Sequence, residues 1–401
     1  MRRLLNLFLL LLPGMLVIAC GGGDTATEPT QAPAEAAVQS DTTLSTGLSA
    51  IAAEGIEKHL RFLADDARQG RMTGSPEYDE AAAYVAEQFA AMGLDPGGED
   101  GGWFQAVPLL SRTLDEDSAT LVFHQDGEAN AQRFKEDFVM GGDYVRPKTE
   151  VTAEVVFAGF GVHAPELGYS DYDDIDVEGK IVALFGGAPA TFPHNERAYY
   201  SSSLAKSEEA VRRGAIGLIS LRSRVDQQRY DWKRITQFAT GQPGMTWINL
   251  SGRAANYFPE LRGGAIVNVP SAEDLFSRSP ISFEDALDAA DAGTPLSTPL
   301  GVEATLARET QHESISSPNV IGILRGSDPE LADEYVVFTA HLDHVGVGEA
   351  VNDDTIYNGM YDNAMGSSIL IETARAFVSM PEAPKRSIIS VSYTHLRAHE
   401  T

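Results

Sequence analysis

The chain has 401 residues but a single cysteine, Cys20. One cysteine excludes a disulfide framework and every zinc module that binds its metal through several cysteines. Basic residues are also scarce, because 30 Lys and Arg stand against 58 Asp and Glu and give a formal net charge of −28. A field of that sign repels polyanions, so we expect no nucleic acid as a partner. Hydrophobic residues, at 43%, suffice for a folded chain, and the length allows two domains.

A long apolar run is found at the N-terminus. It covers residues 4–19, follows Arg2 and Arg3, and ends directly before Cys20 and three glycines. This pattern is typical of a secretory signal, and the run is short for a transmembrane helix. Its end resembles the lipobox of bacterial lipoproteins. We therefore expect residues 1–19 to be a signal peptide and Cys20 to carry a lipid that anchors the exported protein in the bacterial cell envelope, in the outer membrane if the host has one.

Residues 20–47 are rich in Thr, Ala, Pro and Gly and contain few large apolar side chains. Such a segment buries too little surface to fold, so we interpret it as a flexible tether. Helical periodicity begins with the next segment, residues 48–106. Its clearest prediction is a helix over 76–92, because Ser75 can cap its start and Gly93 can end it.

Residues 107–300 predict strands, short helices and a final linker. Apolar β-rich runs lie at 154–158, 181–185 and 216–221, and a helix over 204–213 precedes the last of them. The acidic run 171–176 lacks the spacing of an EF-hand and is interpreted as a solvated turn. The stretch from about 145 to 270 resembles the protease-associated (PA) domain. That resemblance implies an insertion that shapes access to a peptidase active site and carries no catalytic residue.

The chemistry-bearing residues follow an apolar strand predicted over 335–340. The strand's composition predicts burial on both faces, and it leads into His341-Leu342-Asp343-His344. In an extended chain His341 and Asp343 point to the same side, where a carboxylate can fix the tautomer of a metal-binding imidazole. About twenty residues later, a tight loop containing Asp362 enters a helix, and a carboxylate at that junction has two oxygens with which to bridge metal ions.

These two motifs, HLDH at 341–344 and NGMYDNAMG at 358–366, together resemble the M28 metallopeptidase family. The segment FLADDARQGRMTGSPEYDEAAAYVAEQF at 62–89 resembles the opening segment of the same family, ahead of an inserted PA domain. The resemblance extends over about residues 50–391 in the expected order. It implies an α/β, phosphorylase/hydrolase-like zinc peptidase fold with an inserted PA domain, and an aminopeptidase acting on peptides.

The resemblance also implies roles for individual residues in a centre with two zinc ions. His341 would ligate one zinc, Asp362 would bridge both, and Asp343 would orient His341. Gly359 and Asn363 would shape the loop, with a cis peptide bond after Asp362. The metal pair of the family activates a water molecule that attacks the peptide bond.

The chain departs from the family after the strand predicted to begin at 386. The family continues with two glutamates, a general base and a zinc ligand, whose positions here are Leu396 and Arg397. Residues 301–391 thus form a metal-site segment with two ligands, and we interpret 392–401 as a tail foreign to the family. His395 and His399 lack the glutamate of an HExxH zinc site. We expect a truncated, inactive chain whose incomplete sheet exposes apolar edges.

Two alternatives remain open. The first is a non-catalytic, peptide-binding envelope lipoprotein that uses the same surfaces without hydrolysis. The second keeps the fold but changes the reaction to that of a glutaminyl cyclase or a carboxypeptidase. Metal ligands and amine-binding residues beyond Thr394 would distinguish these possibilities.

Overall fold

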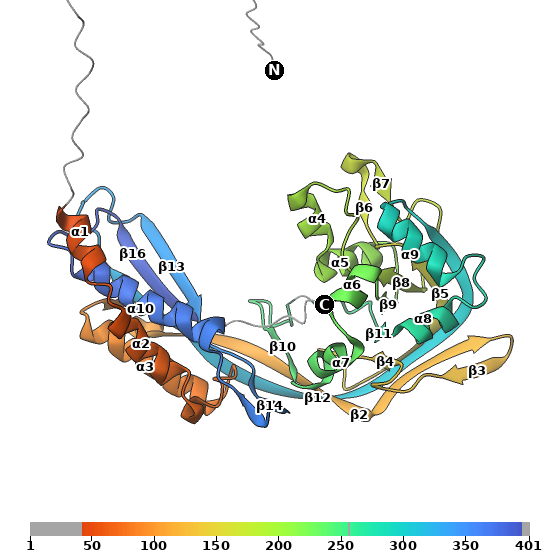
Figure 1. Cartoon of the computed structure of the whole chain (residues 1–401), viewed down its shortest axis with the longest axis horizontal. Helices are drawn as coiled ribbons and strands as arrows, with labels where there is room; N and C mark the ends of the chain where they lie inside the picture. The colour runs from red at the N-terminus through yellow and green to blue at the C-terminus, as the bar shows by residue number, and fades with distance from the viewer. Residues whose placement is uncertain (1–41, 256, 395–401) are drawn as a thin grey trace, which may run out of the picture. The chain divides into compact units, whose positions relative to one another are not determined.

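The computed structural model describes residues 42–255 and 257–394, in which helices and strands are interspersed (Figure 1). Within these ranges no helix is both long and apolar enough to span a membrane. The α-helices are α1 (Thr42–Ser49), α2 (Ala53–Leu63), α3 (Pro76–Ala91), α4 (His194–Tyr200), α5 (Ser203–Arg212), α6 (Arg224–Arg229), α7 (Trp232–Thr240), α8 (Val269–Leu275), α9 (Phe283–Ala292) and α10 (Met365–Val378).

Most strands belong to one mixed sheet, which confirms the predicted α/β class. The strands are β1 (Asp95–Pro96), β2 (Phe104–Gln125), β3 (Glu128–Ala131), β4 (Phe138–Val139), β5 (Lys148–Ala158), β6 (His163–Ala164), β7 (Tyr169–Ser170), β8 (Ile181–Phe185), β9 (Gly217–Leu221), β10 (Gly244–Trp247), β11 (Gly263–Val267), β12 (Ser297–Leu324), β13 (Tyr335–His341), β14 (Gly346–Val351), β15 (Asp354–Tyr357) and β16 (Ser387–Tyr393).

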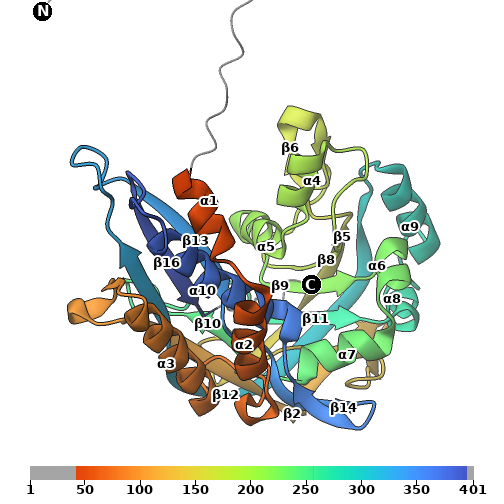
Figure 2. The ribbon, with the colours of Figure 1, turned by 60° about the vertical axis from the view of Figure 1, so that its left-hand side comes forward.

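The 28-residue strand β12 is the spine of this sheet. It pairs antiparallel with β5 through its first part, with β2 from Glu303 to Val320, and with β16 through its last part. β16 in turn pairs in parallel with β13, and β5, β8, β9 and β11 form a parallel series. Both views show β2 and β12 as long curved strands that connect these groups (Figures 1 and 2).

Three hydrophobic cores form among the described residues, and the two larger ones lie along this spine. One lies around β5, β8 and β9 and includes Phe157 and Phe185, whose rings meet edge to face. The other joins α3 and α10 and includes Phe89, Val320 and Ile371. The N-terminal segment therefore packs on the segment that carries the predicted metal residues.

The helix predicted over 76–92 is confirmed as α3. The Ser75 hydroxyl accepts a hydrogen bond from the Tyr78 amide, and Pro76 occupies the first turn. Its apolar stripe, which includes Val85 and Phe89, is fully buried. The strand predicted over 181–185 also coincides with β8.

Several predicted boundaries are wrong. The tether does not extend to residue 47, because α1 begins at Thr42. The linker predicted before residue 300 is already strand from Ser297, and β16 continues through Tyr393, beyond the predicted break after 391. In each case a polar or Thr/Ser-rich stretch adopts regular structure because a neighbouring element offers it hydrogen bonds or an apolar face, which local composition does not reveal.

Two predictions of burial are also corrected. Asp171, assigned to a solvated turn, is buried and accepts hydrogen bonds from the amides of Phe160 and Val162 and from the Tyr169 hydroxyl. Conversely, β13 is not covered on both faces: Tyr335, Val336 and Val337 are exposed. Among the described strands β13 pairs with β16 alone, so it forms an apolar edge of the kind expected for an incomplete sheet.

A buried polar contact between α2 and α10 predicts how stability depends on pH. The His59 ring forms a hydrogen bond with the Tyr84 hydroxyl, and its Nε2 lies 3.1 Å from Oε1 of Glu372. Burial lowers the pKa of His59 despite the Glu372 carboxylate. The unfolded chain therefore binds this proton more readily than the folded chain, so stability is lost as the pH falls below about 6.5.

The variant His59→Gln keeps hydrogen-bonding capacity but cannot titrate. We expect its urea midpoint to fall less between pH 8 and pH 5 than that of the wild type. His194→Gln, on the first turn of α4, serves as the matched control and should behave like the wild type. An equal loss in all three chains would show that His59 does not contribute.

Candidate metal centre

The end of β13 and the start of α10 bring the predicted metal residues together. His341 is the last residue of β13, and its Nε2 lies 3.0 Å from Oδ1 of Asp362 in the turn η4 (Met360–Ala364). On the other side of the ring, Nδ1 lies 3.1 Å from the backbone oxygen of Asp343 and 3.5 Å from its Oδ1. Asp343 is thus placed to hold the ring while Nε2 faces Asp362, as the HxD spacing predicts.

The charges around His341 affect how readily its ring binds a proton. Burial lowers the pKa of His341, but the hydrogen bond and charge of Asp343 and the charge of Asp362 outweigh it, so the pKa is raised. A metal ion between Nε2 and the Asp362 carboxylate would compete with that proton, because a metal ligand must be the neutral imidazole.

The loop around Asp362 has the geometry that the resemblance implies. The Asp362–Asn363 peptide bond is cis. The Asn363 side-chain oxygen accepts a hydrogen bond from the Gly366 amide in the first turn of α10. Gly359 adopts a left-handed φ of +62°, and a Cβ there would lie 2.5 Å from Cγ of His344. Any other residue would push the loop away from the HLDH segment.

A buried arginine from the N-terminal segment holds these pieces in place. The side chain of Arg71 is fully buried, and its guanidinium donates to four backbone oxygens. They belong to the end of α2, to the residue after His341 and to the loop before Asp362: Leu63, Leu342, Asn358 and Gly359. One planar group therefore connects both halves of the candidate centre to the helical layer.

The residues around Arg71 reinforce this connection through their backbone. The Arg71 oxygen accepts from the His344 amide, and the neighbouring Gly70 oxygen accepts from the Gly346 amide. Gly70 is left-handed, with a φ of +68°, and a Cβ would lie 2.4 Å from the Tyr357 oxygen. Thr73 donates its hydroxyl hydrogen to Oδ2 of Asp343 at 3.1 Å, so the same loop also fixes the carboxylate beside His341.

Sequence reasoning missed Arg71 and Thr73. It gave residues 62–89 as a family-like opening segment, without a role for either side chain. The only signal was an arginine directly after a glycine. Thr394, next to the positions of the missing glutamates, is also at the site, since its hydroxyl lies 3.2 Å from that of Thr73.

The described residues fit zinc only in part. An imidazole nitrogen and a carboxylate oxygen are suitable ligands, and His341 and Asp362 supply them from the two predicted positions. However, in residues 42–255 and 257–394 no group of three or more His, Cys, Asp or Glu side chains could hold a metal ion. A catalytic zinc needs three protein ligands, so the described part does not complete even one site. Cys20, Leu396 and Arg397 lie outside the described residues.

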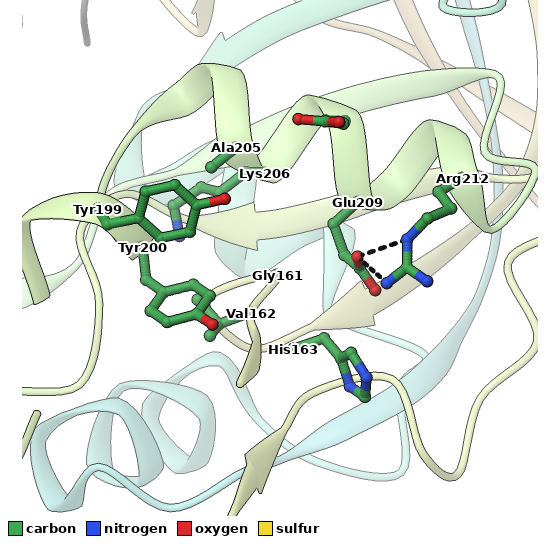
Figure 3. A pocket seen from close by; sticks show the side chains of 10 residues that line it. Gly161, Val162, His163, Tyr199, Tyr200, Ala205, Lys206, Glu209 and Arg212 are labelled. Carbon is green, nitrogen blue, oxygen red and sulfur yellow. Dashed lines mark hydrogen bonds and ion pairs between the residues drawn. The ribbon is translucent and has the colours of Figure 1, made fainter. Parts of the chain in front are cut away.

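The candidate centre is distinct from the cavity drawn in Figure 3. That cavity, of about 210 Å³, lies between α4, α5 and the turn at Gly161, and none of the predicted metal residues lines it. Lys206 does, and its amine donates to the Phe160 oxygen. Burial lowers the pKa of Lys206 to about 7 in spite of the charge of Asp171. We interpret Lys206 and Asp171 as the polar support of this turn.

The geometry defines an α/β protein with a candidate metal centre at the carboxyl end of a strand. The sequence model of peptidase family M28 matches residues 319–395, which include His341, Asp343 and Asp362. This segment is therefore similar to peptidase family M28. The match also extends past the break that the sequence predicts after residue 391. No curated protein matches the chain.

Solved structures that resemble the chain include three bacterial peptidases. An aminopeptidase from Aneurinibacillus sp. strain AM-1 is 16% identical, with a TM-score of 0.48 over 88% of this chain and 64% of that one. A zinc aminopeptidase from Bacillus subtilis is 17% identical (TM-score 0.35; 86% and 62% covered), and a peptidase M28 precursor from Shewanella amazonensis SB2B is 18% identical (0.42; 90% and 67%). The chain spans less than two thirds of the first two proteins.

Removing the Arg71 side chain should destabilise the fold strongly. In Arg71→Met the buried oxygens of Leu63 and Leu342 lose their donor, and each unsatisfied buried group costs about 1–3 kcal/mol. We expect a loss of about 2–6 kcal/mol in the free energy of unfolding, measured in urea, with partial retention in Arg71→Lys, whose single ammonium reaches fewer acceptors. Arg61→Met is the control, because Arg61 is exposed and pairs with Glu57 on the surface of α2. Equal stability of the Arg71 and Arg61 variants would contradict this role.

Proposed function

We propose that the protein is a metal-dependent aminopeptidase of family M28 in which His341 and Asp362 bind zinc and Asp343 orients His341. The observation that carries the proposal is the 3.0 Å approach of His341 Nε2 to Asp362 Oδ1. These two atoms come from segments twenty residues apart, and Arg71 holds both segments. A metal-binding site requires an imidazole and a carboxylate to converge in this way, whereas a turn with a purely structural role does not require it.

Each residue named at the candidate centre then has a defined role. A zinc pair would supply a bound, activated water and polarise the peptide carbonyl. Asp343 keeps the proton of the His341 ring on Nδ1, so that Nε2 is available as a ligand. Thr73 fixes the Asp343 carboxylate, and Arg71 fixes the spacing between the two loops. The substrates would be peptides with a free N-terminus, because the family resemblance implies the removal of N-terminal residues.

A complete centre needs further groups. The general base and the remaining ligands are not found in the described residues, so we propose that the 401-residue chain is inactive. An active form would take these groups from a longer polypeptide. A non-catalytic peptide-binding lipoprotein is the second candidate function, and the observation that favours it is the same shortage of ligands.

The remaining predictions concern the surroundings of the centre. We propose that residues 107–300 contain a PA-type insertion that shapes access to it. Support comes from the parallel series β5, β8, β9 and β11 around a hydrophobic core of its own. We also propose a lipid anchor at Cys20 and a location in the cell envelope, on the basis of the N-terminal sequence pattern.

Zinc binding and hydrolysis test the proposal directly. The 401-residue chain should bind zinc weakly, lose it on dialysis and fail to hydrolyse L-leucine p-nitroanilide, because two ligands do not hold the metal. The weak binding, measured by calorimetry, should disappear in His341→Ala and in Asp362→Asn and persist in His194→Ala. Two zinc ions retained through dialysis would contradict the proposed incompleteness.

An independent DNA read across codons 380–401 and beyond separates the two candidate functions. A frame that continues with a Thr-Ala-Glu-Glu-like strand and later Asp and His residues supports the aminopeptidase. The longer protein should then bind two zinc ions and release N-terminal residues. A stop after Thr401 in the source gene favours the non-catalytic binding protein.

A further inference from the structure

A cluster of buried positive charge contrasts with the acidity of the chain. The carboxylate of Asp143 lies among three arginines. These are Arg112 on β2, Arg308 on β12 and Arg146 in the loop before β5. We call these four residues the arginine cluster. Three guanidinium groups against one carboxylate leave an excess of two positive charges in a chain whose net charge is −28.

Asp143 does not neutralise the cluster through hydrogen bonds. Its side chain is 1% exposed, and its Oδ1 accepts from the amides of Val145 and Arg146 and from the Tyr257 hydroxyl. Its Oδ2 lies 3.6 Å from Nη2 of Arg308 and 3.8 Å from Nη1 of Arg146, beyond hydrogen-bond range. The carboxylate therefore organises its own loop and leaves the guanidinium groups under-compensated.

The two strand arginines are restrained by backbone oxygens and an aromatic ring. Arg112 donates to the Gly142 oxygen and stacks on Tyr144, with 3.6 Å from its Cζ to the ring centroid. Arg308 donates to the Gly141 oxygen at 2.7 Å. Burial lowers the pKa of both arginines. The pKa of Arg308 falls to about 10, and the charge of Arg112 contributes to that fall. The two guanidinium groups thus bind the oxygens of two consecutive residues, Gly141 and Gly142.

Each of the three arginines keeps a donor nitrogen without a partner in the described part of the chain. Within the described residues, Nε of Arg112, Nε of Arg308 and Nη1 of Arg146 are buried and have no hydrogen-bond partner. A buried charge without a partner costs several kcal/mol, so such groups are normally paired with an opposite charge. In the same part of the chain, Oδ2 of Asp143 is also buried and without a hydrogen-bond partner, so what the cluster lacks is negative charge, which an anion provides.

We propose that Arg112, Arg146 and Arg308 form a binding site for a small monovalent anion. One negative charge removes half of the local excess and offers acceptors to the unpartnered N–H groups. A single charge suits the site better than two, because Asp143 repels every anion placed beside it. The site lies on β2, β12 and the loop between β4 and β5, apart from the metal centre, and it does not depend on the proposed peptidase activity.

Thermal stability in chloride tests the site. At constant ionic strength, replacing the bulky anion isethionate by 100 mM chloride should raise the melting temperature of the wild type by several degrees, because an ion that binds the folded state alone stabilises it. Arg308→Gln should lose this shift. Arg133→Gln should keep it, since Arg133 is an exposed arginine paired with Glu136 and Asp137.

A second arm with 100 mM acetate identifies the source of the anion. A shift with chloride indicates a free halide, whereas a shift with acetate alone indicates the carboxylate of an organic acid or peptide, and either supports the site. No shift with either anion overturns the proposal, as does an equal shift in Arg308→Gln.

Bromide supplies a measurement that needs no variant. In a crystal of the wild-type chain soaked in bromide, the anomalous difference map should show a peak within hydrogen-bonding distance of the arginine cluster. Water density without an anomalous signal at this position would overturn the proposal, even if Arg308→Gln failed to fold.

Discussion

The candidate centre depends on the full satisfaction of one buried cation. Arg71 places its guanidinium among four carbonyl oxygens from three segments that are distant in sequence. A buried charge that loses its acceptors is costly, so these segments cannot separate without exposing an unpaired cation. The positions of His341 and Asp362 follow from that requirement, because one lies beside Leu342 and the other follows Gly359.

Buried arginine is used in two different ways in this protein. Arg71 is matched by backbone acceptors, and its surroundings are closed by Gly70 and Gly359, where no Cβ would fit. Arg112 and Arg308 have fewer acceptors, and their charges repel each other. The first arrangement stabilises a loop junction by itself, whereas the second is balanced only when negative charge arrives from elsewhere. The difference lies in the number of acceptor oxygens around each guanidinium group and not in the residue type.

Local sequence signals predicted elements whose cause is local. Ser75 and Pro76 mark the start of α3, and the apolar run Ile181–Phe185 is a strand because nothing else in that stretch competes. The lengths of β2 and β12 were not predictable in this way. Long stretches of both strands are polar, and they are strands because each pairs with the other and with further neighbours. The sequence also contained no sign that Asp171 is buried, because its hydrogen bonds come from backbone amides of another segment.

The sequence by itself determined the α/β class and predicted His341, Asp343 and Asp362 as site residues, because both inferences depend on residue types and on short spacings along one chain. The tertiary structure alone decided that His341 and Asp362 meet at 3.0 Å, that Arg71 and Thr73 hold them, and that three arginines share one carboxylate. Those facts arise between residues tens to hundreds of positions apart. No local pattern encodes them, since burial and hydrogen-bond satisfaction are properties of the assembled packing.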